Sequence, residues 1–276
     1  MTEPLISAEE LARRLDGDTR VVDVRWYLQD PGLGRRRYAT AHLPGAVFLD
    51  LETDLSDTAV QDAGRHPLPD REALAELLGG IGIGNQHLVV AYDDSGGAIA
   101  ARLWWLLRWL GHADVAVLDG GWRAWTDAGL PTTPDVPEHQ PTSFAIHPPL
   151  TKVVDRSTVE HRGDSVLYDA RAPERYLGEV EPIDPIAGRI PGAVNIPTAT
   201  LLGPGGRFLP PEELATTLGP TTERSIASCG SGVTACAVIL AAVAAGLPEP
   251  ALFPGSYSEW SRAGLPVASG PSASPV

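Results

Sequence analysis

Short runs of apolar residues alternate with segments of helical spacing along the first half of the chain. Short apolar runs of this kind are typical of buried strands, and they lie at Val21–Val24, where Asp23 interrupts the run, and at Leu88–Tyr92 and Val115–Leu118. Apolar residues at intervals of three and four predict helices at Ser7–Leu15, Asp70–Leu78 and Gly97–Leu110. Strands that return through helices form a parallel sheet covered on both faces. We therefore expect an α/β fold, in which ligands bind in the loops at the carboxyl ends of the strands.

The second half of the chain repeats motifs of the first half in the same order. The pairs are VVDVR (21–25) with LYDAR (167–171), HLPGAV (42–47) with RIPGAV (189–194), and VLDGGWRAW (117–125) with LFPGSYSEW (252–260). Repeats in one order and at nearly constant spacing indicate a duplicated domain. We predict one copy at 1–134, a second at 150–276, and a linker at 135–149, within the stretch at 132–150 that is rich in proline and threonine.

Length and charge narrow the classes of function. The 276 residues, at 29.2 kDa, suffice for two domains of ordinary size. With 21 Lys and Arg against 35 Asp and Glu, the net charge of −14 repels phosphate backbones and anionic lipid surfaces, so we expect neither nucleic-acid nor membrane partners. The first twenty residues lack a basic start followed by an apolar core, which predicts a cytoplasmic protein. We expect the tail at 268–276 to be disordered.

The loop after one strand of the second copy carries the strongest chemical signal. Residues 225–228 have a strand pattern, CGSGVT at 229–234 is rich in glycine, and 235–246 has the composition of a buried helix. A cysteine that opens such a loop has backbone N–H groups turned toward its sulfur and the positive end of a helix behind it. Both favour the thiolate over the thiol. The pattern therefore predicts that Cys229 is a nucleophile.

Other interpretations of this loop stay open. An inert core cysteine is one, and a non-catalytic binding module is another. A cysteine-dependent phosphatase is a third, but its loop needs an arginine six residues after the cysteine to grip phosphate, and this chain has Ala235 there. The second cysteine, Cys236, lies within the apolar helix and is expected to be core. Two cysteines are too few for a disulfide framework or a structural zinc site.

The whole pattern resembles the two-domain rhodanese-type sulfurtransferases. The resemblance rests on the paired Asp-x-Arg and Pro-Gly-Ala-Val motifs, the paired segments that end in Trp125 and Trp260, and the CGSGVT loop. It implies two tandem rhodanese-like domains, each a parallel sheet flanked by helices. It also implies a sulfurtransferase that carries sulfur as a persulfide on Cys229 and uses no cofactor and no metal.

Within that family the loop looks like that of the 3-mercaptopyruvate sulfurtransferase branch. Members that prefer thiosulfate commonly place basic residues in the loop, whereas Gly230, Ser231 and Gly232 add no charge. The resemblance thus implies 3-mercaptopyruvate as the donor, with thiosulfate as the alternative by the same mechanism. The acceptor it implies is a thiol or cyanide, with thioredoxin as a candidate protein acceptor.

A donor with a carboxylate needs a cation in the site. Arg175 matches the arginine of the family's Arg-aromatic-x-Gly segment, which contacts that carboxylate, and the planar guanidinium suits bidentate pairing. Family members often have a second arginine nine residues further on, where this chain has Asp184. Arg189 is the substitute cation that we predict, with a surface role as the alternative. Arg171, beside the strand end, is expected to form a structural ion pair.

The remaining predicted site residues come from the loop and from the first copy. Ser231 is close enough to the nucleophile to relay a proton. In the family this serine pairs with a histidine and an acidic residue, which correspond here to His66 and to Glu52, with Asp50 as the alternative acid. The loop residues that we expect to bind the donor and shelter its sulfur are Gly230, Gly232, Val233 and Thr234.

The equivalent loop of the first copy has an acid in place of the nucleophile. When residues 90–93 are aligned with 226–229, Asp93 falls where Cys229 stands. A carboxylate cannot carry a sulfane sulfur. The first copy is therefore expected to be catalytically silent.

Overall fold

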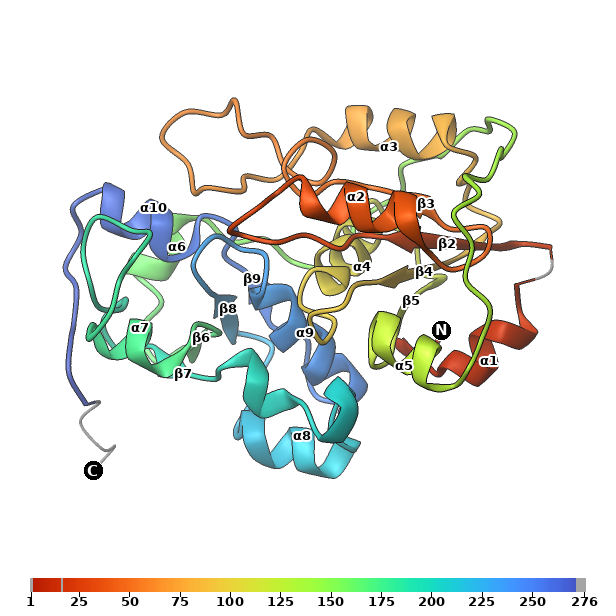
Figure 1. The fold of residues 1–276 in the computed structure, drawn as a ribbon. Helices are drawn as coiled ribbons and strands as arrows, with labels where there is room; N and C mark the ends of the chain where they lie inside the picture. Colours follow the sequence, from red (N-terminus) through yellow and green to blue (C-terminus); the bar gives the residue numbers. More distant parts are fainter. Residues whose placement is uncertain (1, 16, 272–276) are drawn as a thin grey trace. The chain divides into compact units, whose positions relative to one another are not determined.

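A computed structural model describes residues 2–15 and 17–271 (Figure 1). The chain divides into two compact units, and neither unit is a single continuous stretch of sequence. The first unit consists of Met1–Asp57, Leu68–Thr151 and Leu202–Leu209, and the second of Thr58–Pro67, Lys152–Leu201 and Pro210–Val276. The repeated motifs did not indicate that 58–67 belongs to the second unit or that 202–209 belongs to the first. The stretch at 135–149, expected to be a linker, belongs to the first unit and hydrogen-bonds to it through Thr142, Ala145 and His147.

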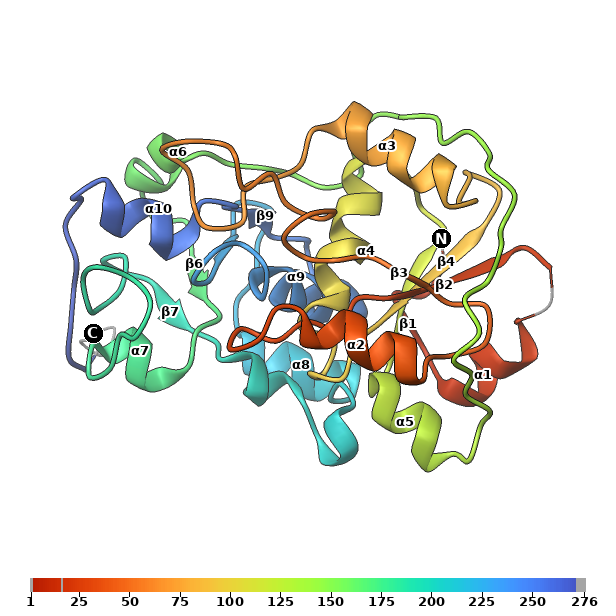
Figure 2. The same ribbon diagram turned by 45° about the horizontal axis from the view of Figure 1, so that its top comes forward.

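The first unit is built on a five-stranded parallel sheet in the order β1-β5-β4-β2-β3. Its strands are β1 (Leu5–Ile6), β2 (Thr19–Asp23), β3 (Val47–Phe48), β4 (Leu88–Tyr92) and β5 (Val115–Leu118). Its helices are α1 (Ala8–Arg13), α2 (Leu33–Thr40), α3 (Arg71–Gly80), α4 (Ala100–Trp109) and α5 (Gly121–Asp127), with a short 3-10 turn, η2 (Pro204–Gly206). Figure 2 shows α1 and α5 on one side of this sheet and α4 on the other.

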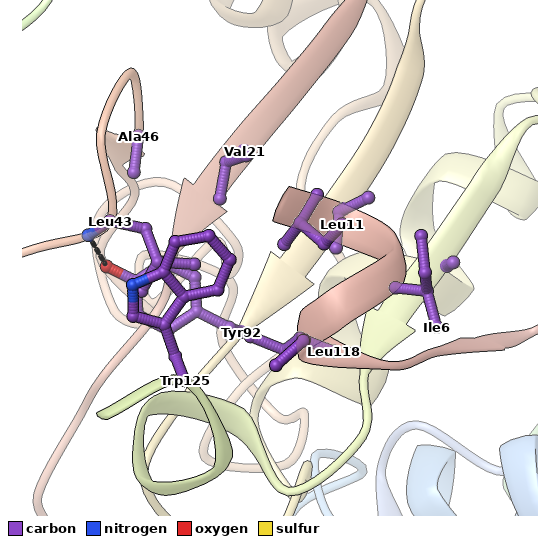
Figure 3. Close-up of a cluster of buried hydrophobic side chains, with 11 residues drawn as sticks. Ile6, Leu11, Val21, Leu43, Ala46, Tyr92, Leu118 and Trp125 are labelled. Atoms are coloured by element: carbon purple, nitrogen blue, oxygen red, sulfur yellow. Dashed lines mark hydrogen bonds between the residues drawn. The ribbon is translucent and has the colours of Figure 1, made fainter. Parts of the chain in front are cut away.

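The core of the first unit follows from the alternation of side chains along its strands. Val21 and Tyr92 point to the face covered by α1 and α5, where they pack with Leu11 and Trp125 (Figure 3). Alternate residues such as Val89 are equally buried on the opposite face. Because both faces are covered, β4 and β5 consist of unbroken apolar runs, as the sequence predicted.

The second unit has a four-stranded parallel sheet in the order β7-β6-β8-β9. Its strands are β6 (Leu167–Asp169), β7 (Val194–Asn195), β8 (Ile226–Ser228) and β9 (Ala251–Leu252). Its helices are α6 (Arg156–Glu160), α7 (Pro173–Leu177), α8 (Pro211–Leu218), α9 (Ala235–Ala244) and α10 (Ser256–Arg262), with the 3-10 turn η1 (Thr198–Leu201). Since β8 is an inner strand, its carboxyl end opens between β6 and β9, which is where a parallel sheet places ligands.

The predicted α/β architecture with two parallel sheets is confirmed. The strand patterns at Leu88–Tyr92 and Val115–Leu118 match β4 and β5 in full, and the helix expected from Asp70 begins at Arg71, with the Asp70 carboxylate accepting the N–H of Ala73 as its cap. The helix expected from Gly97 begins later, at Ala100, because residues 95–99 form a loop around Asp93. Within the described residues, no helix is long and apolar enough to span a bilayer.

Candidate active site

Cys229 follows β8 directly and opens the loop that enters α9. Its side chain is buried, with only 2% of the residue exposed. The sulfur accepts a hydrogen bond from the backbone N–H of Gly232 at 3.1 Å. One loop N–H group is therefore turned toward the sulfur, and such a group stabilises negative charge on it.

The two glycines of the loop are required for different reasons. Gly232 has a φ of +78°, and a Cβ there would lie 2.3 Å from the carbonyl oxygen of Pro254. A Cβ on Gly230 would instead lie 2.9 Å from Nη2 of Arg65 and 3.4 Å from Nη1 of Arg175. Gly232 thus allows the turn of the backbone, and Gly230 leaves room for two guanidinium groups.

Val233 and Thr234 form the junction between the loop and α9. Their carbonyl oxygens accept the N–H groups of Cys236 and Ala237, so their backbone already belongs to the first turn of the helix. Val233 is buried, and Thr234 is half-buried. Cys236 is fully buried among apolar residues of α9, which confirms its assignment to the core.

Ser256 supports the loop from behind, and the sequence pattern did not reveal it. Its hydroxyl accepts the backbone N–H of Cys229 at 3.0 Å, donates to the carbonyl of Phe253 at 2.9 Å, and lies 4.0 Å from the Cys229 sulfur. Its φ of +52° is unusual for a residue with a side chain. The repeat held the signal that was missed, because the equivalent position of the first unit is Gly121, with a φ of +53°.

Ser231 and His66 lie within hydrogen-bond distance, although 165 residues separate them in sequence. Nδ1 of His66 is 2.8 Å from Oγ of Ser231, and both residues are buried. The segment Thr58–Pro67, which carries His66, belongs to the second unit. The serine and the histidine are thus within reach of each other, and their expected role in proton transfer stays a prediction.

Glu52 and Asp50 belong to the first unit. The carboxylate of Asp50 caps the turn that follows it, accepting the backbone N–H groups of Glu52 at 2.9 Å and of Thr53 at 3.3 Å. Glu52 is half-buried. The assistance that either acid was expected to give Ser231 stays a prediction.

Arg175, on α7, is held by two acids. Its Nε and Nη2 donate to the carboxylate of Glu181 at 3.2 and 2.8 Å, and Nη2 also donates to Oδ2 of Asp184 at 3.0 Å. Its Nη1 faces the backbone of Gly230, the residue that follows Cys229. Arg175 therefore lies where a carboxylate-binding residue was expected.

Arg65 is the second guanidinium at this position, and the sequence analysis missed it. Its Nη1 donates to Oδ1 of Asp184, and its Nη2 faces Gly230. Burial lowers the pKa of the Arg65 guanidinium, and the charge of Asp184 opposes that effect. Asp184, which we had taken as the loss of a cation, is thus the residue that binds one.

Burial and charge act in opposite directions on the two acids. Burial raises the pKa of Asp184, Glu181 adds to that rise, and Arg65 and Arg175 oppose it. Burial also pushes the pKa of Glu181 upward, but the backbone N–H of Asp184 and the guanidinium of Arg175 bring it below its ordinary value. Arg171 forms the structural ion pair that was expected, with Asp169 at 2.6 Å.

Arg189 hydrogen-bonds to backbone carbonyl groups of the second unit. Its guanidinium donates to the carbonyl oxygens of Gly270 at 2.6 Å and Tyr176 at 3.4 Å, and it stacks over the Tyr176 ring. Its backbone pairs with Ala268. Nη1 of Arg189 is thus engaged with the C-terminal segment, and the expected role of Arg189 as a substitute substrate cation stays a prediction. The same bonds give residues 268 and 270 a fixed place, contrary to expectation, while 272–276 lie outside the described residues.

The equivalent loop of the first unit is filled by its own carboxylate. Asp93 Oδ1 accepts the N–H groups of Ser95 and Gly97, both at 2.9 Å, and Oδ2 accepts those of Ile99 and Ala100 at 2.8 and 2.9 Å. The N–H groups that would surround a charged sulfur here surround an acid side chain. This geometry fits the expected silence of the first copy.

The chain matches the family model of the rhodanese-like domain twice, at residues 7–128 and 157–263. It belongs to the rhodanese family. Among the described residues, no group of three His, Cys, Asp or Glu side chains is placed to hold a metal ion.

Relatives of this rhodanese-family chain carry two donor names. A probable 3-mercaptopyruvate sulfurtransferase of Pseudomonas aeruginosa is 46% identical over 93% of this chain and 94% of its own length. A putative thiosulfate sulfurtransferase of Mycobacterium tuberculosis is 42% identical over 93% of each chain. The solved structure of 3-mercaptopyruvate sulfurtransferase from Leishmania major superposes with a TM-score of 0.83 at 32% identity, covering 95% of this chain and 75% of that one.

Proposed function

We propose that this protein is a sulfurtransferase that takes sulfur from 3-mercaptopyruvate onto Cys229 and passes it to a thiol. The observation that carries the proposal is the position of Cys229 at the end of β8. Its sulfur accepts the Gly232 N–H, and two guanidinium groups lie beside the neighbouring residue, Gly230. A nucleophilic sulfur with two guanidinium groups close to it suits a short donor that has a sulfur at one end and a carboxylate at the other.

The first step transfers sulfur to the protein. The Cys229 thiolate attacks the sulfur of 3-mercaptopyruvate, a S–S bond forms, and the C–S bond of the donor breaks with its electron pair leaving on carbon. The product is the enolate of pyruvate, which takes a proton to become pyruvate. In this proposal Ser231 delivers that proton and His66 restores it, which the hydrogen-bond distance between the two side chains supports.

The second step returns the cysteine to its starting state. An acceptor thiolate, or cyanide in an assay, attacks the outer sulfur of the persulfide, the S–S bond breaks, and Cys229 leaves as thiolate. Small thiols and thioredoxin are the acceptors that we propose. Because the sulfur travels on the protein itself, these steps call for no cofactor. The cycle needs a reduced Cys229, which fits a cytoplasmic location.

Thiosulfate is the second candidate donor, favoured by the name of the mycobacterial relative. The same thiolate would attack its outer sulfur, and sulfite would leave. Two observations favour 3-mercaptopyruvate: no charged side chain stands in the loop at 229–234, and the paired arginines beside it are already matched with buried acids. A donor with one negative charge suits such a site better than a dianion.

The test is a side-by-side measurement of initial rates of sulfur transfer to cyanide from 3-mercaptopyruvate and from thiosulfate. Wild type, Cys229→Ser and the matched control Cys236→Ser are compared. We expect higher kcat/KM with 3-mercaptopyruvate, loss of turnover in Cys229→Ser, and retention in Cys236→Ser. A higher kcat/KM with thiosulfate would show that thiosulfate, and not 3-mercaptopyruvate, is the preferred donor. Turnover that survives in Cys229→Ser would overturn the proposal.

A further inference from the structure

We infer that the second unit has a further binding site, for a small organic anion with an apolar body, in a cavity at the amino edge of its sheet. The cavity has a volume of about 540 Å³, a size typical of sites for small molecules. Ile226 and Ala251, the first residues of β8 and β9, line it. Cys229 follows the other end of β8, and none of the residues that line the cavity takes part in the proposed transfer of sulfur.

Apolar residues from three segments of the chain line the cavity. Ile226 and Ala251 are buried, and Val154 is half-buried. Val153 pairs with Leu252 in a parallel bridge and thereby continues the sheet past β9, yet the residue is 41% exposed. The apolar body of a ligand would remove this surface from water, which favours binding.

Positive charge surrounds this apolar surface. The titratable side chains that line the cavity are Lys152, Arg162, Arg224, His161 and one acid, Glu223. Of the ion pairs between described residues, none includes the lysine or either arginine. The whole chain has a net charge of −14, so this excess of cations is a local feature of the cavity. A ligand with a negative charge complements it.

Arg162 is the cation whose position is best fixed. Its Nη1 donates to the carbonyl oxygen of Val159 at 2.9 Å, and its Nη2 donates to that of Pro191. Burial lowers the pKa of the Arg162 guanidinium, and no acid among the described residues opposes that effect. An anion bound in the cavity would supply the negative charge that this half-buried guanidinium lacks.

The first unit has a cavity at the same edge of its own sheet, but the charges around that cavity are balanced. Its volume is about 590 Å³, and two cations and two acids line it: Arg13, Arg14, Asp18 and Asp114. Leu88, the first residue of β4, lines it as well. The alignment of 90–93 with 226–229 places Arg224 at the position of Leu88. The second copy therefore has a cation where the first copy has an apolar residue.

A second difference concerns the arginine that follows the first helix of each copy. Counted from the first residues of α1 and α6, Arg14 and Arg162 are equivalent. Arg14 forms an ion pair with Glu10 at 2.7 Å. The residue equivalent to Glu10 is Thr158, which lines the cavity of the second unit and has no charge. The second copy thus keeps the arginine without its acid, which leaves that charge for a ligand.

The test compares two fluorescent probes that have the same aromatic body. Anilinonaphthalenesulfonate carries a sulfonate, and N-phenylnaphthylamine lacks it. We expect the sulfonate to bind the wild type saturably with a Kd of about 100 μM or tighter. The neutral amine should bind about tenfold more weakly, because it makes no charged hydrogen bond. Methanesulfonate, which has the anion without the body, should not displace the probe at the same concentration.

Substitution of the cations should weaken binding of the sulfonate and not of the amine. Arg162→Gln should raise the Kd of the sulfonate about tenfold. Lys152 and Arg224 are exposed, so each single change to Gln should raise it only about threefold. Thermal unfolding shows whether each variant is folded. If Arg162→Gln does not fold, the double variant Lys152→Gln, Arg224→Gln decides, with an expected loss of about tenfold.

The matched controls lie at the two other places where an arginine could hold the probe. Arg14→Gln changes the equivalent cavity of the first unit, and Arg175→Gln changes the guanidinium beside Gly230. Neither should alter the Kd of the sulfonate, and saturating thiosulfate should not displace the probe. Loss of affinity in either control, or displacement by thiosulfate, would place the probe elsewhere and overturn the inference. Equal affinity for the two probes, or wild-type affinity in folded variants at Arg162, Lys152 and Arg224, would overturn it as well.

Discussion

The hydroxyl of Ser256 accepts a hydrogen bond from the backbone N–H of Cys229 at 3.0 Å, and the φ of Ser256 itself is +52°. The first unit has glycine at the equivalent position, Gly121, and there the backbone approaches Asp93 so closely that a Cβ would lie 2.2 Å from its carbonyl oxygen. In the second unit the residue at this position thus has an unusual backbone conformation, and its side chain makes a hydrogen bond to the peptide group of Cys229.

Replacing Ser256 should separate the hydrogen bond from the strain. Ser256→Ala leaves the buried N–H of Cys229 without its partner and keeps the strained φ, so we expect a loss of about 1–3 kcal/mol of unfolding free energy. Ser256→Gly loses the same bond but relieves the strain, so it should be the more stable of the two. Urea denaturation of both variants measures the order. A Ser256→Gly protein less stable than Ser256→Ala would show that strain is not stored at this residue.

The pair of Ser231 and His66 predicts a dependence on the donor. Ser231→Ala should slow persulfide formation from 3-mercaptopyruvate by about 10²-fold or more, because the departing enolate needs a proton. Thiosulfate releases sulfite, which leaves without one, so its rate should change little. Single-turnover measurement of the first step with both donors tests this. Equal losses with the two donors would mean that Ser231 shapes the loop rather than moves a proton.

Removal of the Asp93 side chain should leave a site in the first unit that can bind an anion. Asp93→Ala leaves four loop N–H groups without their acceptor, and we expect a loss of about 2–4 kcal/mol of unfolding free energy. Phosphate should restore part of this loss by occupying the loop, and it should not stabilise the wild type. Thermal unfolding with and without phosphate measures both effects. Asp127→Ala, at an exposed ion pair, is the control and should be neutral.

Substitution of the two loop glycines by alanine should affect different properties of the protein, KM for Gly230 and stability for Gly232. Gly230→Ala places its methyl group against the ends of two arginine side chains, which can move, so we expect a raised KM and little loss of stability. Gly232→Ala meets the Pro254 carbonyl and a left-handed backbone, so we expect a less stable protein. Kinetics and thermal unfolding of both variants decide. Similar effects from the two substitutions would contradict the assignment of separate roles.

Arg189 should matter for the C-terminal segment and not for the donor. Arg189→Met removes the donors to Gly270 and Tyr176, so hydrogen exchange at residues 268–270 should accelerate. The KM for 3-mercaptopyruvate should stay as in the wild type. A raised KM with unchanged exchange would support the original prediction that Arg189 binds the donor.

The sequence by itself determined the architecture and predicted the reacting atom, the sulfur of Cys229. Parallel strands buried on both faces read as apolar runs, which made β4 and β5 visible, and the duplication followed from motifs in one order. Cys229 was evident because a strand, a glycine-rich loop and a helix are contiguous in the chain. For the same reason, the substitution of Asp93 in the first copy could be read by alignment alone.

Only the tertiary structure decided which cations stand beside that atom. Arg65 and Asp184 are 119 residues apart, and nothing in the local pattern of 58–67 shows that this segment folds with the second unit. Arg189 was a reasonable substitute in sequence, but its fork is occupied by carbonyl groups close to the end of the described chain. Periodicity and motifs report contacts between neighbours in sequence. The pairing of a buried acid with a distant arginine depends on where the chain returns, and that is decided by packing over the whole unit.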